Sequence, residues 1–280
     1  FLGHGTDNSW DEALHLTLPL LAIPFDAEPG VLQRVLTSDE LATLHAARER
    51  RIAGRIPTPY ITQQAWFCGL PFYVDERVLI PRSPLGELID DGFYPWLQYE
   101  PEHILDLCCG SACIAIACVE AFPAARVDAA DISADALAVA AINVAQYQLQ
   151  DRLQLVESDM FSGLHDRRYD LIVCNPPYVD AEDMNSLPDE YRHEPELALA
   201  SGDDGLDFTR RLLREAKKHL TEAGILIVEV GNSAEALENA FPTVPFVWLE
   251  FQRGGDGVFM LTAEDLQQHA DSFHADVLME

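Results

Sequence analysis

Residues 171–178, Leu-Ile-Val-Cys-Asn-Pro-Pro-Tyr, join an apolar run to two consecutive prolines and mark where a central strand must end. Proline fixes its own backbone angle and has no N–H donor, so Pro176 and Pro177 cannot continue a sheet. The side-chain oxygen of Asn175 and the carbonyl of Pro176 can accept the two hydrogens of a planar amino group, while the ring of Tyr178 covers its π face. A rigid strand-to-loop turn without chemistry is the alternative interpretation of the same residues.

From about residue 100 onward, apolar runs alternate with helical patterns. The helical patterns fall at 112–122, 134–149 and 207–220, and the runs that predict strands are residues 103–107, 126–130, 153–156, 169–174, 225–230, 247–251 and 258–261. This alternation predicts an α/β fold with a doubly wound, mostly parallel sheet, whose ligands bind at the carboxyl ends of the strands. The acidic segment 264–280 is expected to be a solvated helix end.

Polar residues at the predicted strand ends suit a nucleoside. Gly110 lets the backbone approach a ligand closely, and the helix that follows offers free N–H groups. Asp131 can accept hydrogen bonds from both ribose hydroxyls, and Asp159 is placed to reach an exocyclic amine. Taken singly, each aspartate could instead cap a helix, as Asp131 could ahead of Ser133. The candidate cofactor-binding residues are Asp106, Cys108, Gly110, Ala112, Asp131, Ile132, Asp159, Met160 and Asn175.

Four such strand ends in chain order, finishing with Asn175-Pro176-Pro177-Tyr178, resemble the class I S-adenosylmethionine-dependent methyltransferases. The tetrad resembles that of members acting on amide or exocyclic amino nitrogens. The resemblance implies a Rossmann-like seven-stranded sheet, S-adenosyl-L-methionine as cofactor, S-adenosyl-L-homocysteine as product, and catalytic roles for Asn175, Pro176 and Tyr178. A nicotinamide dehydrogenase is the competing interpretation, but it needs a Gly-x-Gly-x-x-Gly turn that this chain does not have.

The first third of the chain narrows the family. Helical patterns precede an alternating stretch at 66–74, which predicts a β-hairpin, and then comes Ile80-Pro81-Arg82. A helical head, a hairpin and an Ile-Pro-Arg segment before the catalytic fold resemble the N(5)-glutamine protein methyltransferases, along essentially the whole chain. The resemblance implies that Arg82 and all four tetrad residues, Asn175, Pro176, Pro177 and Tyr178, contact the substrate. The expected regions are a helical substrate-recognition domain at 1–64, a β-hairpin linker at 65–85 and a methyltransferase domain at 86–280.

Two segments indicate a branch of that family. Gly3-His4-Gly5-Thr6-Asp7-Asn8 and Pro81-Arg82-Ser83-Pro84-Leu85-Gly86-Glu87 are similar to the enzymes that methylate a glutamine of the third large-subunit ribosomal protein. Release-factor enzymes typically have Pro-Arg-Pro-Glu-Thr-Glu at the second segment, and release factors are the alternative substrate. An amino-methyltransferase acting on nucleic acid and a non-catalytic ribosome-assembly factor also stay open.

The cofactor turn departs from the family pattern at two positions. Cys109 stands where Thr is usual, and Ala112 stands where Gly is usual. The extra methyl of Ala112 is expected to press on the cofactor or on the contact between helix and strand. We expect weaker cofactor affinity, and no loss of binding.

Charge and cysteine usage bear on the partners. The chain has 47 acidic and 18 basic residues, a formal charge of −29, which repels a phosphate backbone and attracts a basic protein. This charge suits the basic ribosomal protein of the large subunit that the resemblance implies as partner, and we expect no binding of duplex nucleic acid. No apolar run approaches the length of a membrane span. The six cysteines lie mostly in apolar patterns without paired Cys-x-x-Cys motifs, so we expect no metal site and a cytoplasmic location.

Overall fold

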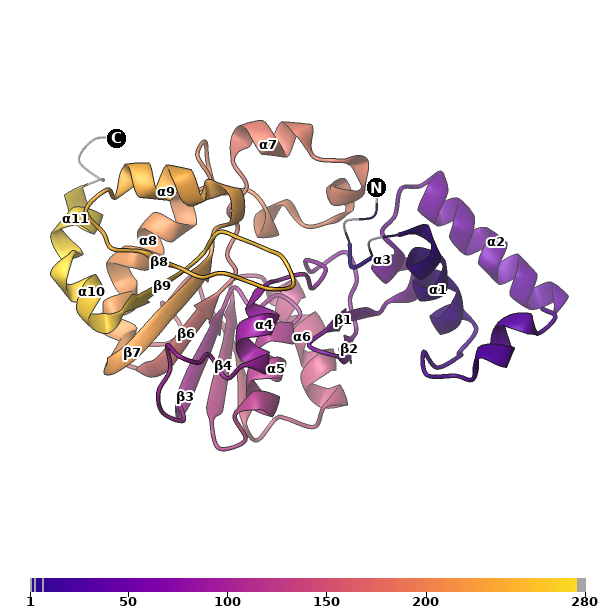
Figure 1. Ribbon diagram of the computed structural model, residues 1–280, viewed down its shortest axis with the longest axis horizontal. Coiled ribbons are helices and arrows are strands. Elements are labelled where there is room, and N and C mark those ends of the chain that lie inside the picture. Colours follow the sequence, from indigo (N-terminus) through magenta and orange to yellow (C-terminus); the bar gives the residue numbers. More distant parts are fainter. Residues whose placement is uncertain (1, 3, 7, 276–280) are drawn as a thin grey trace.

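One twisted sheet forms the centre of the molecule (Figure 1). The computed structural model describes residues 2, 4–6 and 8–275. Seven strands of this part form a sheet in the order β5-β4-β3-β6-β7-β9-β8, parallel except for β9, which runs antiparallel to both of its neighbours. The strands are β3 (His103–Leu107), β4 (Arg126–Asp131), β5 (Leu153–Glu157), β6 (Tyr169–Cys174), β7 (Leu220–Glu229), β8 (Val247–Trp248) and β9 (Val258–Thr262). The predicted α/β class and mostly parallel sheet are confirmed.

Successive residues of each strand pack into two separate hydrophobic cores, because side chains alternate between the two faces of a sheet. Ile104, Leu171 and Ile225 pack under the helices of one face, whereas Leu105 and Ile172 pack under those of the other. The first face carries α4 (Leu85–Asp90), α5 (Cys113–Ala121) and α6 (Ala134–Gln146), and the second carries α8 (Asp207–Glu215), α9 (Ala234–Ala240), α10 (Ala263–Gln268) and α11 (Ala270–Ala275). The helix predicted at 207–220 ends earlier than expected, because residues 216–219 form a 3-10 turn before β7.

The carboxyl-terminal segment is not the solvated helix end that its acidity predicts. Leu266 of α10 and Phe273 of α11 are each 1% exposed, and both belong to the core of the second face. Asp271, the acidic residue between them, is exposed, so the acidic composition of the segment did not reveal the spacing of its apolar residues. The expectation was wrong for residues 264–275, while 276–280 lie outside the described residues.

The amino-terminal part lies beside the sheet and joins it through the β1–β2 hairpin (Figure 1). Thr37 caps α2 by accepting from the backbone N–H of Glu40, whose carboxylate accepts from Thr37 N in return. Gly3 and Asp7 of the predicted branch motif lie outside the described residues. The elements are α1 (Ser9–Leu20), η1 (Pro29–Gln33), α2 (Ser38–Ile52), α3 (Thr58–Thr62), β1 (Ala65–Phe67) and β2 (Leu70–Phe72).

One buried amide anchors the hairpin to the catalytic part. Asn143, on α6 and 0% exposed, accepts from Tyr73 N at 2.8 Å and donates to Tyr73 O at 3.0 Å and Ser111 O at 2.9 Å. A buried amide is tolerated when its donors and acceptor are satisfied in this way. Asn143 therefore fixes the segment after the hairpin against the turn that follows β3.

Strand register brings the predicted site residues to one edge. Leu107 at the end of β3 pairs with Ala130 of β4 on one side and with Cys174 of β6 on the other. The sheet order runs one way from β3 to β5 and the other way from β6, so β3 and β6 flank the switch point where ligands bind in such sheets. Asn175 follows β6 directly and lies at this point. The loop after it contains α7 (Ala181–Ser186), η2 (Asp189–His193) and η3 (Glu196–Ala198).

Candidate active site

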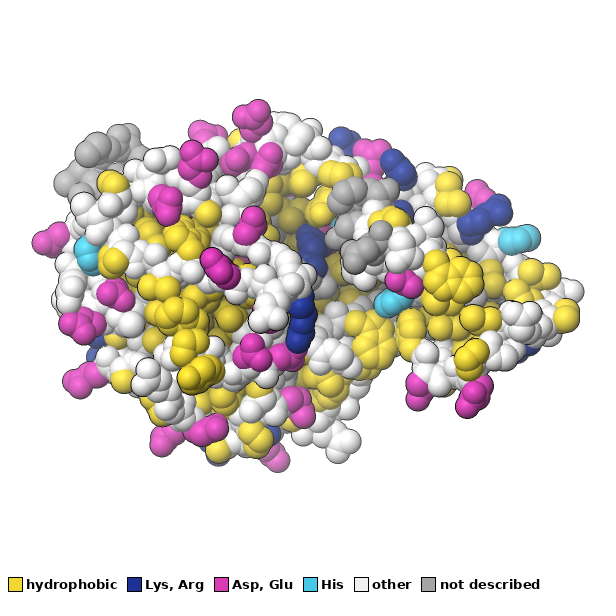
Figure 2. Space-filling view, in the orientation of Figure 1, with side chains coloured by type: hydrophobic (Ala, Val, Ile, Leu, Met, Phe, Trp, Pro, Cys, Tyr) yellow, Lys and Arg dark blue, Asp and Glu magenta, His cyan; other side chains and the backbone are white. Residues whose placement is uncertain are grey.

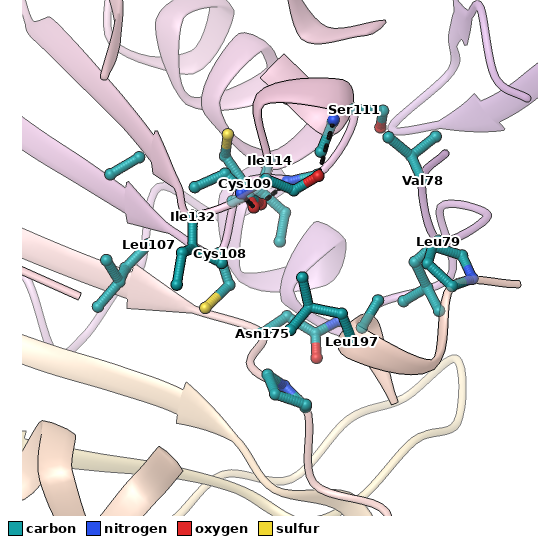
Figure 3. A pocket seen from close by; sticks show the side chains of 18 of the residues that line it. Val78, Leu79, Leu107, Cys108, Cys109, Ser111, Ile114, Ile132, Asn175 and Leu197 are labelled. Atoms are coloured by element: carbon teal, nitrogen blue, oxygen red, sulfur yellow. Dashed lines mark hydrogen bonds between the residues drawn. The ribbon is translucent and has the colours of Figure 1, made fainter. Parts of the chain in front are cut away.

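A cavity of about 230 Å³ opens at the carboxyl ends of β3, β4, β5 and β6. Figure 3 shows Leu107, Cys108 and Asn175 reaching it from the strand ends, with Val78 and Leu79 on the opposite side. Most of the residues predicted from the sequence lie in its wall: Arg82, Cys108, Gly110, Asp131, Ile132, Asp159, Met160, Asn175 and Pro177. Asp106 and Ala112 lie behind the wall and do not line it, and Pro176 and Tyr178 line a second cavity.

The turn after β3 is built from left-handed backbone. Cys108, Gly110 and Ala112 have φ values of +64°, +51° and +62°. A Cβ added at Gly110 would meet no atom within 4 Å, so the backbone there faces open space of the kind that a close-fitting ligand fills. The turn therefore exposes its peptide groups to the cavity, which suits a ligand that binds along the backbone.

Asp106 supplies a buried acceptor beneath this turn. Its Oδ2 accepts from Ala115 N at 2.9 Å, while no hydrogen-bond partner for Oδ1 is found in the part of the chain that the structure describes. Burial, opposed in part by the hydrogen bond from Ala115, raises the pKa of Asp106 to about 8. An unsatisfied buried oxygen next to an open turn is consistent with a ligand that brings a donor or a positive charge.

Ala112, which stands where Gly is usual in the family, does not line the cavity. The residue precedes α5, is 0% exposed and packs in the core of the first face. Its methyl group therefore lies at the contact between helix and strand, the second of the two places expected, and not against the ligand space. A left-handed alanine costs about 1–2 kcal/mol, which the packing of the turn has to offset.

Asp131 accepts hydrogen bonds from two backbone groups while it lines the cavity. Its Oδ2 accepts from Gly110 N and its Oδ1 from Ser133 N, both at 2.9 Å. Ser133 itself caps α6 by accepting from Ala136 N, so Asp131 is not the helix cap that was the structural alternative. Burial raises the pKa of Asp131, and the backbone donors oppose this shift. A carboxylate has further lone pairs, and these are available on the cavity side.

Asp159 is placed at the cavity but is already paired. Its Oδ1 lies 3.0 Å from Arg211 Nη2 of α8, with about half of each side chain exposed. Arg211 also lines the cavity, although the sequence patterns did not indicate it. Met160 beside it is 2% exposed, with a φ of +53°.

A second cavity, of about 330 Å³, adjoins the first, and Asn175 lines both. Pro176 and Tyr178 face the second cavity, whereas Pro177 faces the first. The rigid tetrad thus forms part of the wall between two spaces, one suited to a nucleoside and one open toward the loop at 183–191. An amide side chain at this wall can contact ligands in both.

Tyr178 is held from three sides. Its hydroxyl donates to Glu229 Oε1 at 3.0 Å, and its carbonyl accepts from Ser233 Oγ at 2.8 Å. Its ring packs on Gly231, where an added Cβ would lie 2.7 Å from Tyr178 Cε2. The ring is therefore fixed before any ligand arrives.

Arg82 lines both cavities, and its guanidinium forms an ion pair with Glu194. Its guanidinium donates to Glu194 from both terminal nitrogens, at 2.5 and 2.7 Å, and lies 5.1 Å from the centre of the Tyr191 ring. Glu194 also accepts from Ile80 N at 3.1 Å, and its Oε2 lies 3.5 Å from His4 Nε2. Burial alone raises the pKa of Glu194, but hydrogen bonds from His4 and Arg82 hold it below its ordinary value.

The loop after the tetrad also contacts the amino-terminal helices. Arg51 of α2 lies 2.6 Å from Glu12 and 3.4 Å from Glu190, whose side chain is fully buried. His193 Nε2 lies 3.0 Å from Gly54 O. Figure 2 shows Lys and Arg side chains in the hollow where the two parts meet, and Asp and Glu side chains scattered over the outer surface. The helical head thus bounds the loop that covers the second cavity.

Two chemical facts limit what the site does. Within the described ranges, no group of three or more His, Cys, Asp or Glu side chains is arranged to hold a metal ion. Burial raises the pKa of Cys109 well above its ordinary value, so the thiol beside the turn is protonated at neutral pH.

None of the helices in the described part is both long enough and apolar enough to cross a membrane.

The chain is similar in sequence to known methyltransferases. A family model described as the methyltransferase small domain matches residues 93–189. The ribosomal protein uL3 glutamine methyltransferase of Francisella tularensis is 47% identical over 98% of this chain and 88% of its own length. The protein of the same name from Neisseria gonorrhoeae is 51% identical over 95% of this chain and 89% of its own length.

Solved structures support the fold alone. A methyltransferase from Pyrococcus furiosus has a TM-score of 0.50 and 16% identity, covering 81% of this chain and 99% of that one. The hMettl16 catalytic domain, solved with a MAT2A 3'UTR hairpin, has a TM-score of 0.53 and 18% identity, covering 80% and 81%. At such identity the likeness extends to the architecture of the sheet and its helices.

Proposed function

The chain belongs to the ribosomal protein uL3 glutamine methyltransferases, and on that premise we propose that it methylates the side-chain amide nitrogen of a glutamine in ribosomal protein uL3. S-adenosyl-L-methionine is the methyl donor of the family, and S-adenosyl-L-homocysteine is the product. The observation that carries the proposal is the position of Asn175 in the wall shared by the two cavities. The cofactor occupies the first cavity and the target side chain the second.

The first cavity fits a nucleoside with a charged amino-acid end. The open backbone at Gly110 and the unsatisfied oxygen of Asp106 below it favour the amino-acid end there. Asp131 accepts from the ribose hydroxyls, and Ile132 and Met160 cover the purine beside Asp159. S-adenosyl-L-methionine supplies an electrophilic methyl group when it is bound.

Replacing Asp131 with alanine is expected to weaken S-adenosyl-L-methionine binding by about 10–100-fold, because hydrogen bonds to a charged acceptor are each worth about 1.5–3 kcal/mol. Isothermal titration calorimetry on the variant and on Asp131→Asn, which keeps an acceptor for Gly110 N, separates ribose binding from support of the turn. Asp135→Ala, an exposed aspartate on α6, is the matched control. Unchanged affinity in Asp131→Ala would remove this residue from the cofactor site.

The second cavity holds the target amide. A glutamine nitrogen is a poor nucleophile because its lone pair is delocalised into the carbonyl. Asn175 Oδ1 and the carbonyl of Pro176 each accept one N–H hydrogen, which aligns the nitrogen with the methyl group and favours the positive charge that builds on it. Tyr178 covers the amide plane and excludes water. The nitrogen becomes acidic on methylation and releases its proton afterwards, so no strong base is required.

Arg82 and Pro177 complete the wall. Because both terminal nitrogens of Arg82 are directed at Glu194, we assign Arg82 to shaping the substrate side and not to neutralising a substrate charge. Pro177 lines the first cavity, on the cofactor side, and keeps the backbone after Pro176 rigid. Substrate selection falls to residues 1–64, whose helices contact the loop at the second cavity, and to the hairpin linker at 65–85, which lines that cavity through Leu79 and Arg82. Both lie outside the methyltransferase domain at 86–280.

The charge of the chain supports the same substrate. A formal charge of −29 attracts a basic ribosomal protein of the large subunit and disfavours duplex nucleic acid. Free cysteines fit a reducing environment, and we place the reaction in the cytoplasm.

The test uses methyl-labelled S-adenosyl-L-methionine with unmodified uL3, unmodified release factor and DNA in separate reactions. Label on a glutamine of uL3, located by mass spectrometry, is the expected result. Label on the release factor would keep the chemistry but contradict the assigned substrate, and label on DNA would contradict the charge argument. Cofactor binding without transfer to any of them would favour a binding factor.

A further inference from the structure

A buried carboxylate at the end of β7 belongs to neither cavity. Glu229 is the last residue of that strand, is 4% exposed and pairs in register with Val258 of β9. A charged group is seldom buried unless partners compensate it. Its partners therefore show what it does.

Glu229 accepts hydrogen bonds from two segments that build the two cavities. Ser83 Oγ donates to its Oε2 at 2.5 Å, and Tyr178 OH donates to its Oε1 at 3.0 Å. Ser83 lines the first cavity and Tyr178 lines the second. The Ser83 oxygen also accepts from Leu85 N at 3.2 Å, at the start of α4. One carboxylate thus connects the segment around Arg82 with the tetrad.

We propose that Glu229 is a positioning residue for the transfer reaction: in its ionised form it holds Tyr178 over the target amide and Ser83 beside the cofactor. This inference rests on the proposed function. An ionised carboxylate only accepts, so two hydroxyl donors can point at it together. A protonated carboxyl carries its own hydrogen toward one of these hydroxyls, which then has to accept instead of donate and turn its own hydrogen elsewhere.

The surroundings make this ionisation sensitive to pH near neutrality. Burial raises the pKa of Glu229 to about 7, and the hydrogen bonds from Ser83 and Tyr178 and the charge of Arg82 oppose that rise. Burial is the main cause that raises the pKa of the Cys174 thiol of β6, and the charge of Glu229 adds to it, while Glu194 balances the charge of Arg82. Turnover is therefore expected to fall as the pH drops below about 7.

The stability of the fold should change in the opposite sense. Because the folded pKa of Glu229 lies above its ordinary value of 4.5, the folded chain binds more protons than the unfolded chain between about pH 4.5 and 7. The contribution of Glu229 to stability consequently falls as the pH rises through that window. If Glu229 served only to stabilise the fold, the ionised carboxylate that accepts from Ser83 and Tyr178 would not be its less stabilising form.

The test measures kcat from pH 6 to 9 for the wild-type chain and Glu229→Gln. Glutamine keeps the shape but brings a donor toward the two hydroxyls, so kcat at pH 8 is expected to fall about 10²-fold, the loss that a misplacement near 1 Å produces. The inflection near pH 7 should disappear, and cofactor affinity should stay within about twofold. Glu235→Gln, an exposed glutamate of α9, is the matched control.

Ser83→Ala gives a second, independent readout. Removing its donor takes away a hydrogen bond that lowers the pKa of Glu229, so the inflection in kcat should move above pH 7. A merely structural loss would lower kcat equally at every pH. In thermal melts, the midpoint of Glu229→Gln relative to the wild type should rise from pH 6 to pH 8.

If the wild-type chain transfers the label but the pH profile of Glu229→Gln is the same as that of the wild type, this inference alone is overturned. A loss of kcat in Glu229→Gln that is constant across the pH range and matched by a lower melting midpoint would also overturn it. Absence of transfer to uL3 by the wild-type chain would overturn the proposed function, and this inference with it. The wild-type result therefore distinguishes the two failures.

Discussion

Replacing Asn175 with alanine is expected to lower kcat by about 10²–10³-fold, the cost of removing one preorganised polar group from a reacting centre. The residue directly follows β6 and lines both cavities, so its side-chain oxygen is placed to accept from the target nitrogen where the methyl group arrives. Pro176 fixes the backbone on its carboxyl side, so the acceptor is held in place before the target arrives. Asn175→Asp should also lower kcat sharply, because it introduces a charge with its hydration between the two cavities.

Cofactor affinity should stay within a few-fold in both variants, because Asn175 forms one edge of the first cavity while the turn at Gly110 and Asp131 form its floor. Label transfer gives kcat, and calorimetry gives the dissociation constant for S-adenosyl-L-methionine. Asn185→Ala, an exposed asparagine on α7 outside both cavities, controls for the loss of an amide on the same loop. Equal losses of turnover and cofactor affinity would contradict the assigned role.

Arg82→Ala is expected to lower the free energy of unfolding by about 3–5 kcal/mol, because it leaves Glu194 buried without its main counter-charge. The Glu194 side chain is 0% exposed, and among the described residues it would keep the donor from Ile80 N and the contact with His4. Urea unfolding at pH 7.5 measures the change. Arg82→Met combined with Glu194→Gln removes both charges yet keeps an acceptor for Ile80 N, and should regain most of the loss.

The pH dependence of this pair has a definite sign. Because the folded pKa of Glu194 lies below its ordinary value of 4.5, the stabilisation is fully present above that value and is lost as the pH falls through the folded pKa. Arg253→Ala breaks an exposed pair with Asp90 and should change stability far less. A loss in Arg82→Ala no larger than in Arg253→Ala would show that Glu194 finds another partner or is hydrated.

Alternation of apolar runs and helical patterns was sufficient to predict the sheet. The run at 169–174 followed by two prolines predicted both the strand β6 and its end, and the structure has them at Tyr169–Cys174. Because the carboxyl ends of parallel strands meet at one edge, strand order alone brought Gly110, Asp131 and Asn175 together. These predictions depended only on local periodicity and on rules that hold for all such sheets.

Contacts across long stretches of chain could not be predicted in this way. Glu229 lies within the apolar run at 225–230, where a single acidic residue was the only signal of a buried carboxylate that accepts from Ser83, 146 positions away. Asn143 likewise lies in an alanine-rich helix whose pattern does not indicate the hairpin it anchors. Phe273 packs into the core despite an acidic setting, because burial follows the spacing of apolar residues and not the net charge.

The sequence by itself determined the fold class, the switch point and the tetrad, since each follows from neighbours along the chain. Only the tertiary structure decided which polar residues face a cavity and which pair with each other. Arg82 illustrates the difference: its motif indicated a residue of the site, whereas only the fold shows that its guanidinium donates to Glu194, 112 residues later. The physical reason is that the partner of a buried charge is set by where distant segments pack, and a charge that cannot be hydrated must take the partner that packing provides.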